Sequence, residues 1–332
     1  MAHQLTISVA LCTHNGERFL GEQLRSILNQ TLLPQEIVLS DDASADGTVR
    51  LAREMISQHN ALHPDAKLEL HVLRNPTPLG VAKNFEQAIL SCTSDLVALC
   101  DQDDIWAVEK LQRMNAVFAQ RPGLVLLHTD ARLINEAGEP LPGTLFDALE
   151  VVEEAIAAIH AGAAFGVLMR RNLITGATAM IRRKFAAAVA PIPGGWVHDE
   201  WLAMAASVLG EMDVLEDTLI DYRQHGANEI GAAKLSIIGK FRRMTEPGAE
   251  RNRRLLARAT TLVDRFETMR GQVPERGFAA AHAKLRHEQM RASLQSSRIA
   301  RVIPVLRELC TGNYTAFGRG VSDAARDLLQ PL

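Results

Sequence analysis

Three aspartates follow a short apolar run in the first third of the chain. The run Leu96–Cys100 is entirely apolar, and Asp101, Asp103 and Asp104 come directly after it. Such a run is typical of a buried strand in a parallel sheet, and ligands bind at the carboxyl ends of these strands. Two carboxylates spaced two residues apart can share a divalent cation. The spacing therefore predicts a metal site, with an acidic loop that caps the next helix through Asp104 as the alternative.

Further polar residues stand where other predicted elements meet. The segment 13–17, Thr-His-Asn-Gly-Glu, follows a predicted strand over 5–12, and an acidic segment over 40–48 follows a predicted strand over 36–39. Both segments thus follow predicted strands, and strand ends in open α/β sheets are where ligands bind. The acidic segment has a second explanation, because Asp and Ser side chains also form turns and cap helices.

The order of the elements predicts an α/β fold. Strand-like runs alternate with stretches of helical spacing, which is the pattern of right-handed βαβ units in a mostly parallel sheet flanked by helices. Strands are expected over 5–12, 36–39, 71–73, 96–100, 124–128 and 213–220. Helices are expected over 17–29, 81–90 and 109–120, from about 48, and after 201 through Leu202, Met204 and Val208, and a turn is expected over 135–142. No glycine-rich phosphate loop follows a strand, which disfavours a dinucleotide or P-loop site.

The charges divide the chain into an acidic body and a basic tail. The net charge is −3, yet residues 231–332 carry 19 Lys and Arg against 9 Asp and Glu. In this tail Leu235, Ile238, Phe241 and Met244 fall at helical spacing beside basic residues. A basic amphipathic helix can lie on an anionic membrane surface, or it can pack on the body with its charges in water. A basic tail on its own would also suit nucleic acid.

The length and the cysteines indicate the class and the compartment. The 332 residues predict one large α/β domain with an appendage. The four cysteines lack metal-type spacing, and reduced thiols are typical of the cytosol. The sequence has no secretion signal and no run approaching the roughly 18 apolar residues of a spanning helix. We expect a cytoplasmic protein, with any membrane contact peripheral and on the cytoplasmic face.

Five short segments give the sequence a resemblance to a known family. They are Thr13–Asn15, Asp41–Thr48, Asp101–Trp106, His198–Trp201 and Tyr222–Asn228. Together they resemble the family 2 glycosyltransferases of the GT-A fold, in particular the bacterial rhamnosyltransferase-like branch that builds surface polysaccharides. A single Asp-x-Asp is a weak signal, whereas five segments in order are a strong one. The resemblance implies a catalytic domain over 1–231 and a basic, mainly helical C-terminal extension over 232–332.

The resemblance implies how a nucleotide-sugar donor binds. The family's Asp-x-Asp corresponds to Asp101 and Asp103, which with His225 would hold Mn²⁺ or Mg²⁺ against the diphosphate, imidazole suiting Mn²⁺ better. Arg223 would meet a phosphate or form a surface ion pair. The implied nucleotide-binding residues are Thr13, Asn15, Glu17, Asp41, Asp42 and Asp101, with Asp41 or Asp42 accepting a hydrogen bond from a pyrimidine N3–H.

The resemblance also implies the acceptor side. Asp199 corresponds to the general base that deprotonates the acceptor hydroxyl, and Glu200 is the fallback. If Glu200 is not the base, it is expected to be a solvent-facing charge at a helix N-terminus. The implied acceptor-binding residues are Thr175, Gly176, His198 and Trp201. For Trp201, packing of its helix is an equally good explanation, and His198 could instead orient Asp199.

The implied reaction is inverting, metal-dependent transfer of a sugar, with rhamnose from dTDP-rhamnose slightly favoured and UDP-sugars next. The implied acceptor is a saccharide or a lipid-linked molecule, the inner leaflet of the membrane is a partner of the tail, and no nucleic acid is expected. A nucleotidyltransferase also uses strand-end carboxylates and a metal, but the segment 13–17 lacks the Lys or Arg of a triphosphate loop. A non-catalytic adaptor with a basic tail is the third alternative.

Overall fold

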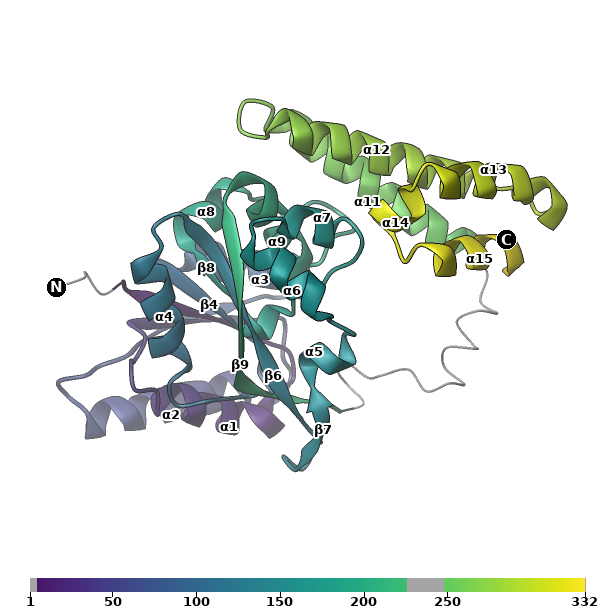
Figure 1. The fold of residues 1–332 in the computed structure, drawn as a ribbon. Coiled ribbons are helices and arrows are strands. Elements are labelled where there is room, and N and C mark those ends of the chain that lie inside the picture. Colours follow the sequence, from purple (N-terminus) through teal and green to yellow (C-terminus); the bar gives the residue numbers. More distant parts are fainter. Residues whose placement is uncertain (1–4, 226–247, 332) are drawn as a thin grey trace.

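The computed structural model describes residues 5–225 and 248–331, which form an α/β body followed by a group of helices (Figure 1). The strands are β1 Ile7–Thr13, β2 Glu36–Asp41, β3 Glu69–Arg74, β4 Leu96–Cys100, β5 Ile105–Trp106, β6 Leu124–Ile134, β7 Pro140–Thr144, β8 Met180–Arg182 and β9 Glu211–Arg223. The helices of the body are α1 Glu17–Leu28, α2 Thr48–Leu62, α3 Val81–Ser91, α4 Lys110–Gln120, α5 Leu145–Ala148, α6 Glu153–His160, α7 Ala164–Leu168, α8 Arg183–Ala188 and α9 His198–Leu209, with a 3₁₀ turn η1 Gly176–Thr178. The C-terminal helices are α11 Gly248–Thr268, α12 Glu275–Ala292, α13 Arg298–Cys310, α14 Asn313–Phe317 and α15 Val321–Leu329.

The described strands form one mixed sheet in the order β3-β2-β1-β4-β8-β6-β9-β5, with β7 paired to β6. Strands β3, β2, β1 and β4 are parallel, β8 runs antiparallel to both of its neighbours, and β6 and β9 are parallel. All residues of β1, β2 and β4 are buried, as expected of strands covered on both faces. Their carboxyl ends carry the polar loops that the sequence singled out.

The second half of the sheet differs from the predicted elements. β6 continues to Ile134 because three polar residues that interrupt its apolar pattern, His128, Thr129 and Asp130, are themselves buried. Ile105–Trp106 forms an unpredicted short strand against β9. The predicted turn over 135–142 is a tight hairpin, in which the Asn135 N–H donates to the carbonyl of Glu139 at 2.9 Å, and β7 begins inside it.

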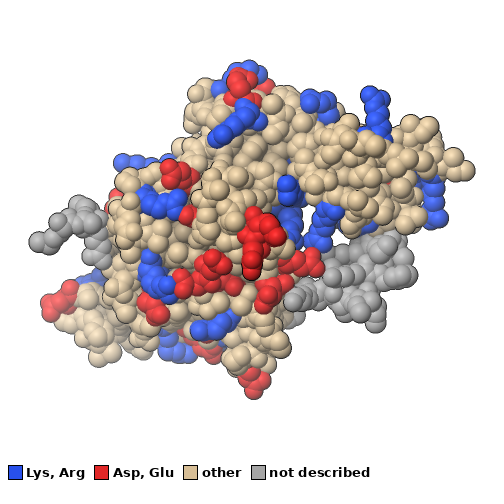
Figure 2. All heavy atoms as spheres, viewed as in Figure 1, with Lys and Arg blue, Asp and Glu red and all other residues tan. Residues whose placement is uncertain are grey.

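The division of charge in the sequence is visible on the surface. On the face drawn in Figure 2, acidic side chains gather over the body, whereas the far right end of the helical region shows Lys and Arg. The amphipathic helix predicted around Leu235 to Met244 lies outside the described residues. In the part of the chain that is described, no helix is both long and apolar enough to cross a membrane.

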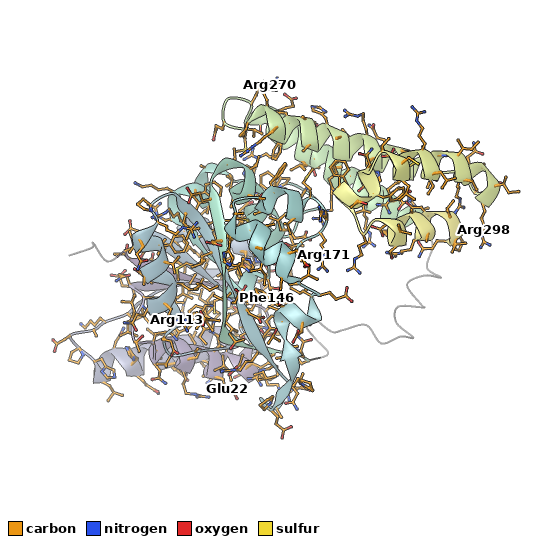
Figure 3. All side chains as sticks on the ribbon, in the orientation of Figure 1. Glu22, Arg113, Phe146, Arg171, Arg270 and Arg298 are labelled. Carbon is orange, nitrogen blue, oxygen red and sulfur yellow. The ribbon has the colours of Figure 1, made fainter. Side chains whose placement is uncertain are left out.

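Hydrophobic side chains fill both faces of the sheet (Figure 3). On one face α1, α2 and α4 pack against residues such as Val9 and Leu11 of β1. On the other face α3 and α9 pack against Ala10 of the same strand. The cluster on this second face also contains Leu262 of α11 and other residues of α11 and α12. The C-terminal helices therefore share the core of the body.

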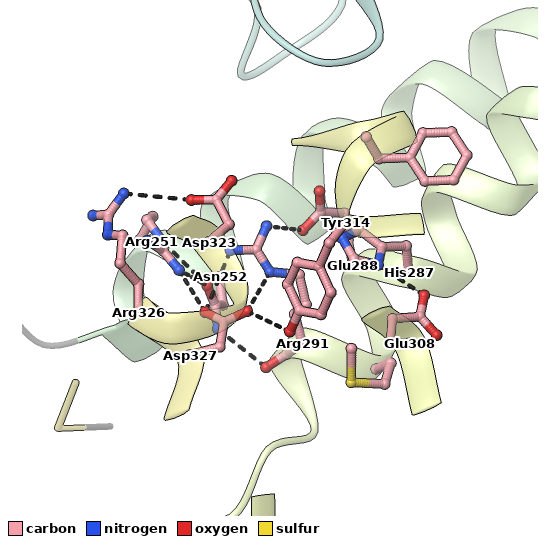
Figure 4. Close-up of polar contacts among 12 residues, drawn as sticks. Arg251, Asn252, His287, Glu288, Arg291, Glu308, Tyr314, Asp323, Arg326 and Asp327 are labelled. Atoms are coloured by element: carbon pink, nitrogen blue, oxygen red, sulfur yellow. Dashed lines mark hydrogen bonds and ion pairs between the residues drawn. The ribbon is translucent and has the colours of Figure 1, made fainter. Parts of the chain in front are cut away.

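A buried network of charges joins the C-terminal helices to one another (Figure 4). The Asp327 carboxylate of α15 accepts hydrogen bonds from Arg291 Nε at 2.7 Å, from the Tyr314 hydroxyl at 2.9 Å and from Arg251 Nη2 at 2.6 Å. These partners belong to α12, α14 and α11. On α13, Arg301 donates to the carbonyls of Asp327 and Gln330. Buried charges of this kind keep elements in one arrangement because leaving any partner unpaired is costly.

Candidate active site

A cleft of about 1030 Å³ opens at the carboxyl ends of the parallel strands. Among the residues predicted for the site, those that line it are Thr13, Asn15, Asp42, Asp101, Asp103, Thr175, Gly176, His198, Asp199 and His225. Three others, Glu17, Asp41 and Trp201, are not part of its lining. The fold thus brings together loops separated by up to about two hundred residues, at the edge where open α/β sheets bind ligands.

Asp103 and His225 form a pair on one wall of the cleft. His225 Nε2 lies 2.7 Å from Asp103 Oδ2, and the two side chains are only 8% and 13% exposed. Phe19 of α1 stacks on the imidazole, with ring centroids 4.9 Å apart. A carboxylate and an imidazole together suit Mn²⁺. Asp101 lines the same cleft.

These residues suit a divalent cation for which the protein supplies only some of the ligands. Among the described residues, no group of three or more His, Cys, Asp and Glu side chains is arranged to hold a metal by itself. A divalent ion bound by two side chains completes its shell with oxygens of water or of a phosphate-bearing ligand. The site is therefore suited to a metal that arrives with, or is fixed by, such a ligand.

Asp104 and Arg223 support this wall from behind. Asp104 is 1% exposed and accepts a hydrogen bond from the Arg223 N–H at 3.0 Å, so it does not cap α4. Arg223 is also 1% exposed, and its guanidinium donates to the carbonyls of Asp103 and Glu136 and to the Glu22 carboxylate. The expected ion pair is present, with Glu22, although Arg223 makes it from a buried position, and Arg223 is not among the residues that line the cleft. Arg223 instead fixes the loop that carries Asp103.

The loop after β1 lies beside the segment that carries the aspartates, because β1 and β4 are neighbouring parallel strands. His14 N–H donates to Gln102 Oε1 at 2.8 Å, and Gln102 Nε2 donates back to the His14 carbonyl at 3.1 Å. Asn15 has a φ of 48°, a left-handed conformation that asparagine tolerates, and its Oδ1 accepts the Ala45 N–H at 2.9 Å. Gln102 was not expected in this role, although its place between the two aspartates was a signal. Its two hydrogen bonds set the distance between the loop and the aspartates.

The acidic end of β2 is largely used within the protein. Asp41 is fully buried, and its carboxylate accepts hydrogen bonds from the Thr13 hydroxyl at 3.0 Å and from Ser44. This corrects the expectation that Asp41 contacts a base. Asp42 lines the cleft, although its carboxylate accepts the N–H groups of Leu79 and Gly80.

Glu17 links the loops after β1 and β2. Its carboxylate accepts the Gly47 N–H at 2.9 Å and pairs with Arg50. It therefore braces the two loops from outside the cleft, which corrects the expectation that it binds the nucleotide.

Asp199 stands in the first turn of α9 on another wall of the cleft. The Gly176 N–H donates to its Oδ2 at 2.9 Å and the Glu200 N–H to its Oδ1 at 2.7 Å. Burial raises the pKa of this carboxyl group, and its effect outweighs the lowering by these hydrogen bonds and by Arg258. The resulting pKa is about 6. A fixed carboxylate with a pKa near neutrality is the kind of group that can accept a proton during a reaction.

His198 lies beside this carboxylate and is neutral. It is 4% exposed, and its ring stacks on Phe85 with centroids 3.8 Å apart. Burial lowers its pKa to about 3. Among the described residues, neither ring nitrogen has a hydrogen-bond partner, an arrangement that costs free energy unless a ligand supplies one. His198 thus lines the cleft, and its contact to an acceptor stays a prediction.

Gly176 is expected to tolerate no side chain. A Cβ at this position would lie 2.4 Å from His198 Nε2, and Phe85 prevents the imidazole from moving away. We expect Gly176→Ala to lower the free energy of unfolding by about 1–3 kcal/mol, the usual cost of overpacking, and to weaken acceptor use more than donor use. Thermal unfolding and separate KM values for the two substrates measure this. Gly166→Ala, where no atom lies within 4 Å of the added Cβ, is the control, and an equal loss there would refute the packing argument.

Trp201 and Glu200 occupy positions other than those expected. Trp201 is fully buried and its indole donates to the Val189 carbonyl at 2.9 Å, so it packs α9 against the body and does not stack on an acceptor. Glu200 is not a solvent-facing charge, because Arg258 of α11 pairs with it at 2.7 Å. Arg258 also lies over the Trp196 ring at 4.5 Å. Sequence reasoning missed Arg258, since it lies in the tail that the resemblance does not cover.

Solved structures of similar shape place this architecture in the GT-A fold class. S. aureus TarS 1–349 in complex with UDP-GlcNAc has a TM-score of 0.57 at 15% identity, over 97% of this chain and 90% of that one. The mannosyltransferase PcManGT from Pyrobaculum calidifontis, in complex with GDP-Man and Mn²⁺, has a TM-score of 0.50 at 17% identity, over 98% and 84%. At these identities the likeness shows the fold alone.

Residues 8–185 match the family model of glycosyl transferase family 2, and the chain belongs to this family. The family and the fold predicted from the sequence are confirmed. An uncharacterized glycosyltransferase of Nostoc is 27% identical over 68% of this chain and 66% of its own length. The dTDP-rhamnosyl transferase RfbG of Shigella flexneri is 31% identical over 31% of this chain and 34% of its own. The chain thus spans slightly less than two thirds of the length of the Nostoc relative and about a third of that of RfbG.

Proposed function

We propose that this protein is an inverting, metal-dependent glycosyltransferase that moves a sugar from a nucleoside-diphosphate donor to a saccharide or lipid-linked acceptor. The observation that carries the proposal is the meeting of two groups in one cleft. The Asp103–His225 pair suits a cation on a diphosphate, and Asp199 suits a general base. This combination favours glycosyl transfer over nucleotidyl transfer or an adaptor role.

The chain's residues divide the reaction between two walls of the cleft. Thr13, Asn15 and Asp42 face the nucleoside, while Asp101, Asp103 and His225 hold the diphosphate end. A divalent cation bound there supplies charge neutralisation for the leaving diphosphate. Asp199 takes the proton of the acceptor hydroxyl as that oxygen bonds to the anomeric carbon. The bond from that carbon to the diphosphate breaks in the same in-line step, which inverts the configuration.

The donor, the pathway and the location belong to the same proposal. A dTDP-rhamnose donor is supported by the similarity to the Shigella rhamnosyl transferase. UDP-sugars come next, because uracil and thymine present the same N3–H and TarS has been solved with UDP-GlcNAc. Relatives named for polysaccharide synthesis, such as TuaG of Bacillus subtilis, support a role in cell-surface polysaccharides. We propose that the protein works in the cytoplasm, at the cytoplasmic face of the membrane, where lipid-linked acceptors are presented.

Calorimetric titration with dTDP, UDP, GDP and CMP tests the donor half. We expect dTDP or UDP to bind in the presence of Mn²⁺ and the heat of binding to disappear after EDTA. Failure of all four nucleotides to bind with Mn²⁺ would refute the proposal. Binding of GDP alone would keep the enzyme class and replace the donor.

The pH dependence of kcat/KM is expected to report the protonation of Asp199. The base must be ionised to act, so activity rises with pH through the raised pKa of about 6 and is lost below it. The rate profile at saturating Mn²⁺ measures this. A rate that stays constant down to pH 4.5, about half a unit above the ordinary aspartate pKa of ~3.9, would mean that no carboxyl group with a raised pKa acts as the base.

Arg258 is expected to set the pH at which activity is lost on the acidic side of this profile, its acid limb. Its charge lowers the pKa values of both Asp199 and Glu200. In Arg258→Met the pKa of Asp199 should therefore rise, and the acid limb should move to higher pH while the rate at high pH is retained. Arg258→Lys keeps the charge and serves as the control. Identical profiles for the wild type and Arg258→Met would contradict the role.

A further inference from the structure

Helix α13 presents a row of apolar side chains to solvent. Among the described residues, eleven large hydrophobic side chains are exposed, and four of them lie on this one helix. They are Ile299 at 86%, Val302 at 40%, Ile303 at 78% and Leu306 at 49% exposure. The spacing i, i+3, i+4, i+7 places all four in one stripe along the helix. Scattered exposed hydrophobic residues need no explanation, but a continuous stripe marks an interaction site.

The stripe cannot turn inward, because the other side of α13 is anchored. Arg301 is 1% exposed and donates to four backbone carbonyls, two of them, those of Asp327 and Gln330, at the C-terminal end of the chain. Val305 is fully buried against Tyr314 of α14. The network of Figure 4 holds these helices together. The helix is therefore a rigid element that is polar and buried on one side and apolar and exposed on the other.

The charges around the stripe are cationic. The two exposed charged residues of α13 are Arg298, directly before Ile299, and Arg307, directly after Leu306. Its one acid, Glu308, is bonded to His287 and Asn313 within the bundle. Arg298 extends from the end of the helical region far from the sheet (Figure 3), where the face drawn in Figure 2 shows Lys and Arg among the described residues.

We propose that α13 docks on an anionic lipid bilayer and lies in its interface, with the stripe in the acyl boundary and Arg298 and Arg307 at the headgroups. An apolar face flanked by basic residues has the chemistry of an interfacial helix, and arginines add attraction to anionic headgroups. A second copy of the chain fits less well, because one row of four side chains is smaller than the roughly 800 Å² that each partner buries in a stable interface. The inference identifies the surface that the proposed membrane location would use, and it is independent of the donor chemistry.

Co-sedimentation of the full chain with vesicles tests this surface. We expect binding to vesicles of phosphatidylglycerol and phosphatidylcholine, and weaker binding to phosphatidylcholine alone. The double variant Ile299→Asp/Ile303→Asp should lose at least about tenfold in partitioning, since burial of each isoleucine contributes about that factor. Arg298→Gln/Arg307→Gln should lose binding to the anionic vesicles and most of the salt dependence.

Leu62→Asp is the matched control, because Leu62 is 76% exposed but lies at the end of α2 in the body. All substituted side chains are exposed, so the circular dichroism and the thermal unfolding should stay as in the wild type. Unchanged vesicle binding of the isoleucine variant would overturn the proposal. So would a dimer in light scattering that this variant converts to monomer, which would assign the stripe to a second copy. Calorimetry with dTDP and UDP on the same variants separates failure of docking from failure of the proposed function.

Discussion

Asp199→Asn is expected to abolish most of the transfer activity while leaving donor binding intact. A general base contributes about 10²- to 10⁴-fold to a rate, and Asp199 lies on a different wall of the cleft from the Asp103–His225 pair. The turnover number should therefore fall by about that factor. Since Asp199 is not part of the Asp103–His225 pair, the dissociation constants of dTDP and UDP with Mn²⁺ should stay within about twofold. This corresponds to a change of only ~0.4 kcal/mol in binding free energy.

Two further measurements make this result unambiguous. The carboxylate of Asp199 accepts the N–H groups of both Gly176 and Glu200, whereas an amide offers a single oxygen. One N–H then loses its partner at a cost of about 1–3 kcal/mol, so thermal unfolding should confirm that the variant is folded. Glu200→Gln should cost far less activity. If Glu200→Gln were the inactive variant, Glu200 would be the base, and a collapse of donor affinity in Asp199→Asn would assign Asp199 to the metal site.

The second large effect is expected at the metal-binding wall. Asp103→Asn and His225→Ala should each weaken Mn²⁺-dependent nucleotide binding by at least about 100-fold, since even residues that only support metal ligands account for 10- to 100-fold. The two side chains are in contact at 2.7 Å, so their double variant should lose less than the sum of the single free-energy changes. Calorimetry with and without Mn²⁺ measures all three variants.

Asp104→Asn is the matched control for this wall. Asp104 is buried beside Asp103, and an asparagine there can still accept the hydrogen bond from the Arg223 N–H. Nucleotide binding should therefore persist in this variant. If Asp104→Asn were as damaging as Asp103→Asn, the ligand would have been assigned to the wrong aspartate. Additive losses in the Asp103 and His225 double variant would show that the two residues do not serve one ion.

The residues at strand ends could be predicted from the sequence for a physical reason. An apolar run followed directly by carboxylates leaves little choice, because the run must be buried and the carboxylates must leave the core. Asp101 and Asp103 were expected at a cleft for this reason and line it, whereas Thr13 and Asn15, which also line it, followed from the resemblance. The histidine–aspartate pair at the start of α9 followed from the resemblance, and both residues line the same cleft.

The residues whose contacts differ from those expected from the sequence have a different feature in common. Composition and spacing show that a side chain is polar or aromatic, but not which of two partners it meets. Asp41 forms the turn after β2, and Trp201 packs inside the core. Either behaviour was compatible with the local sequence. Arg258 could not be predicted, because its contact with Glu200 joins segments 58 positions apart across the fold.

The core shared between α9 and α11 has a consequence for engineering. Leu262 and Phe266 of α11 are fully buried in the same cluster as Trp201, and Arg258 neutralises Glu200 beside the base. A chimaera that keeps residues 1–231 and takes its last hundred residues from a relative would leave a cavity against α9 and an unpaired carboxylate in the cleft. Such grafts should misfold or lose activity even when every cleft residue before position 231 is retained. Single loops can therefore be exchanged between relatives, whereas the whole C-terminal segment cannot.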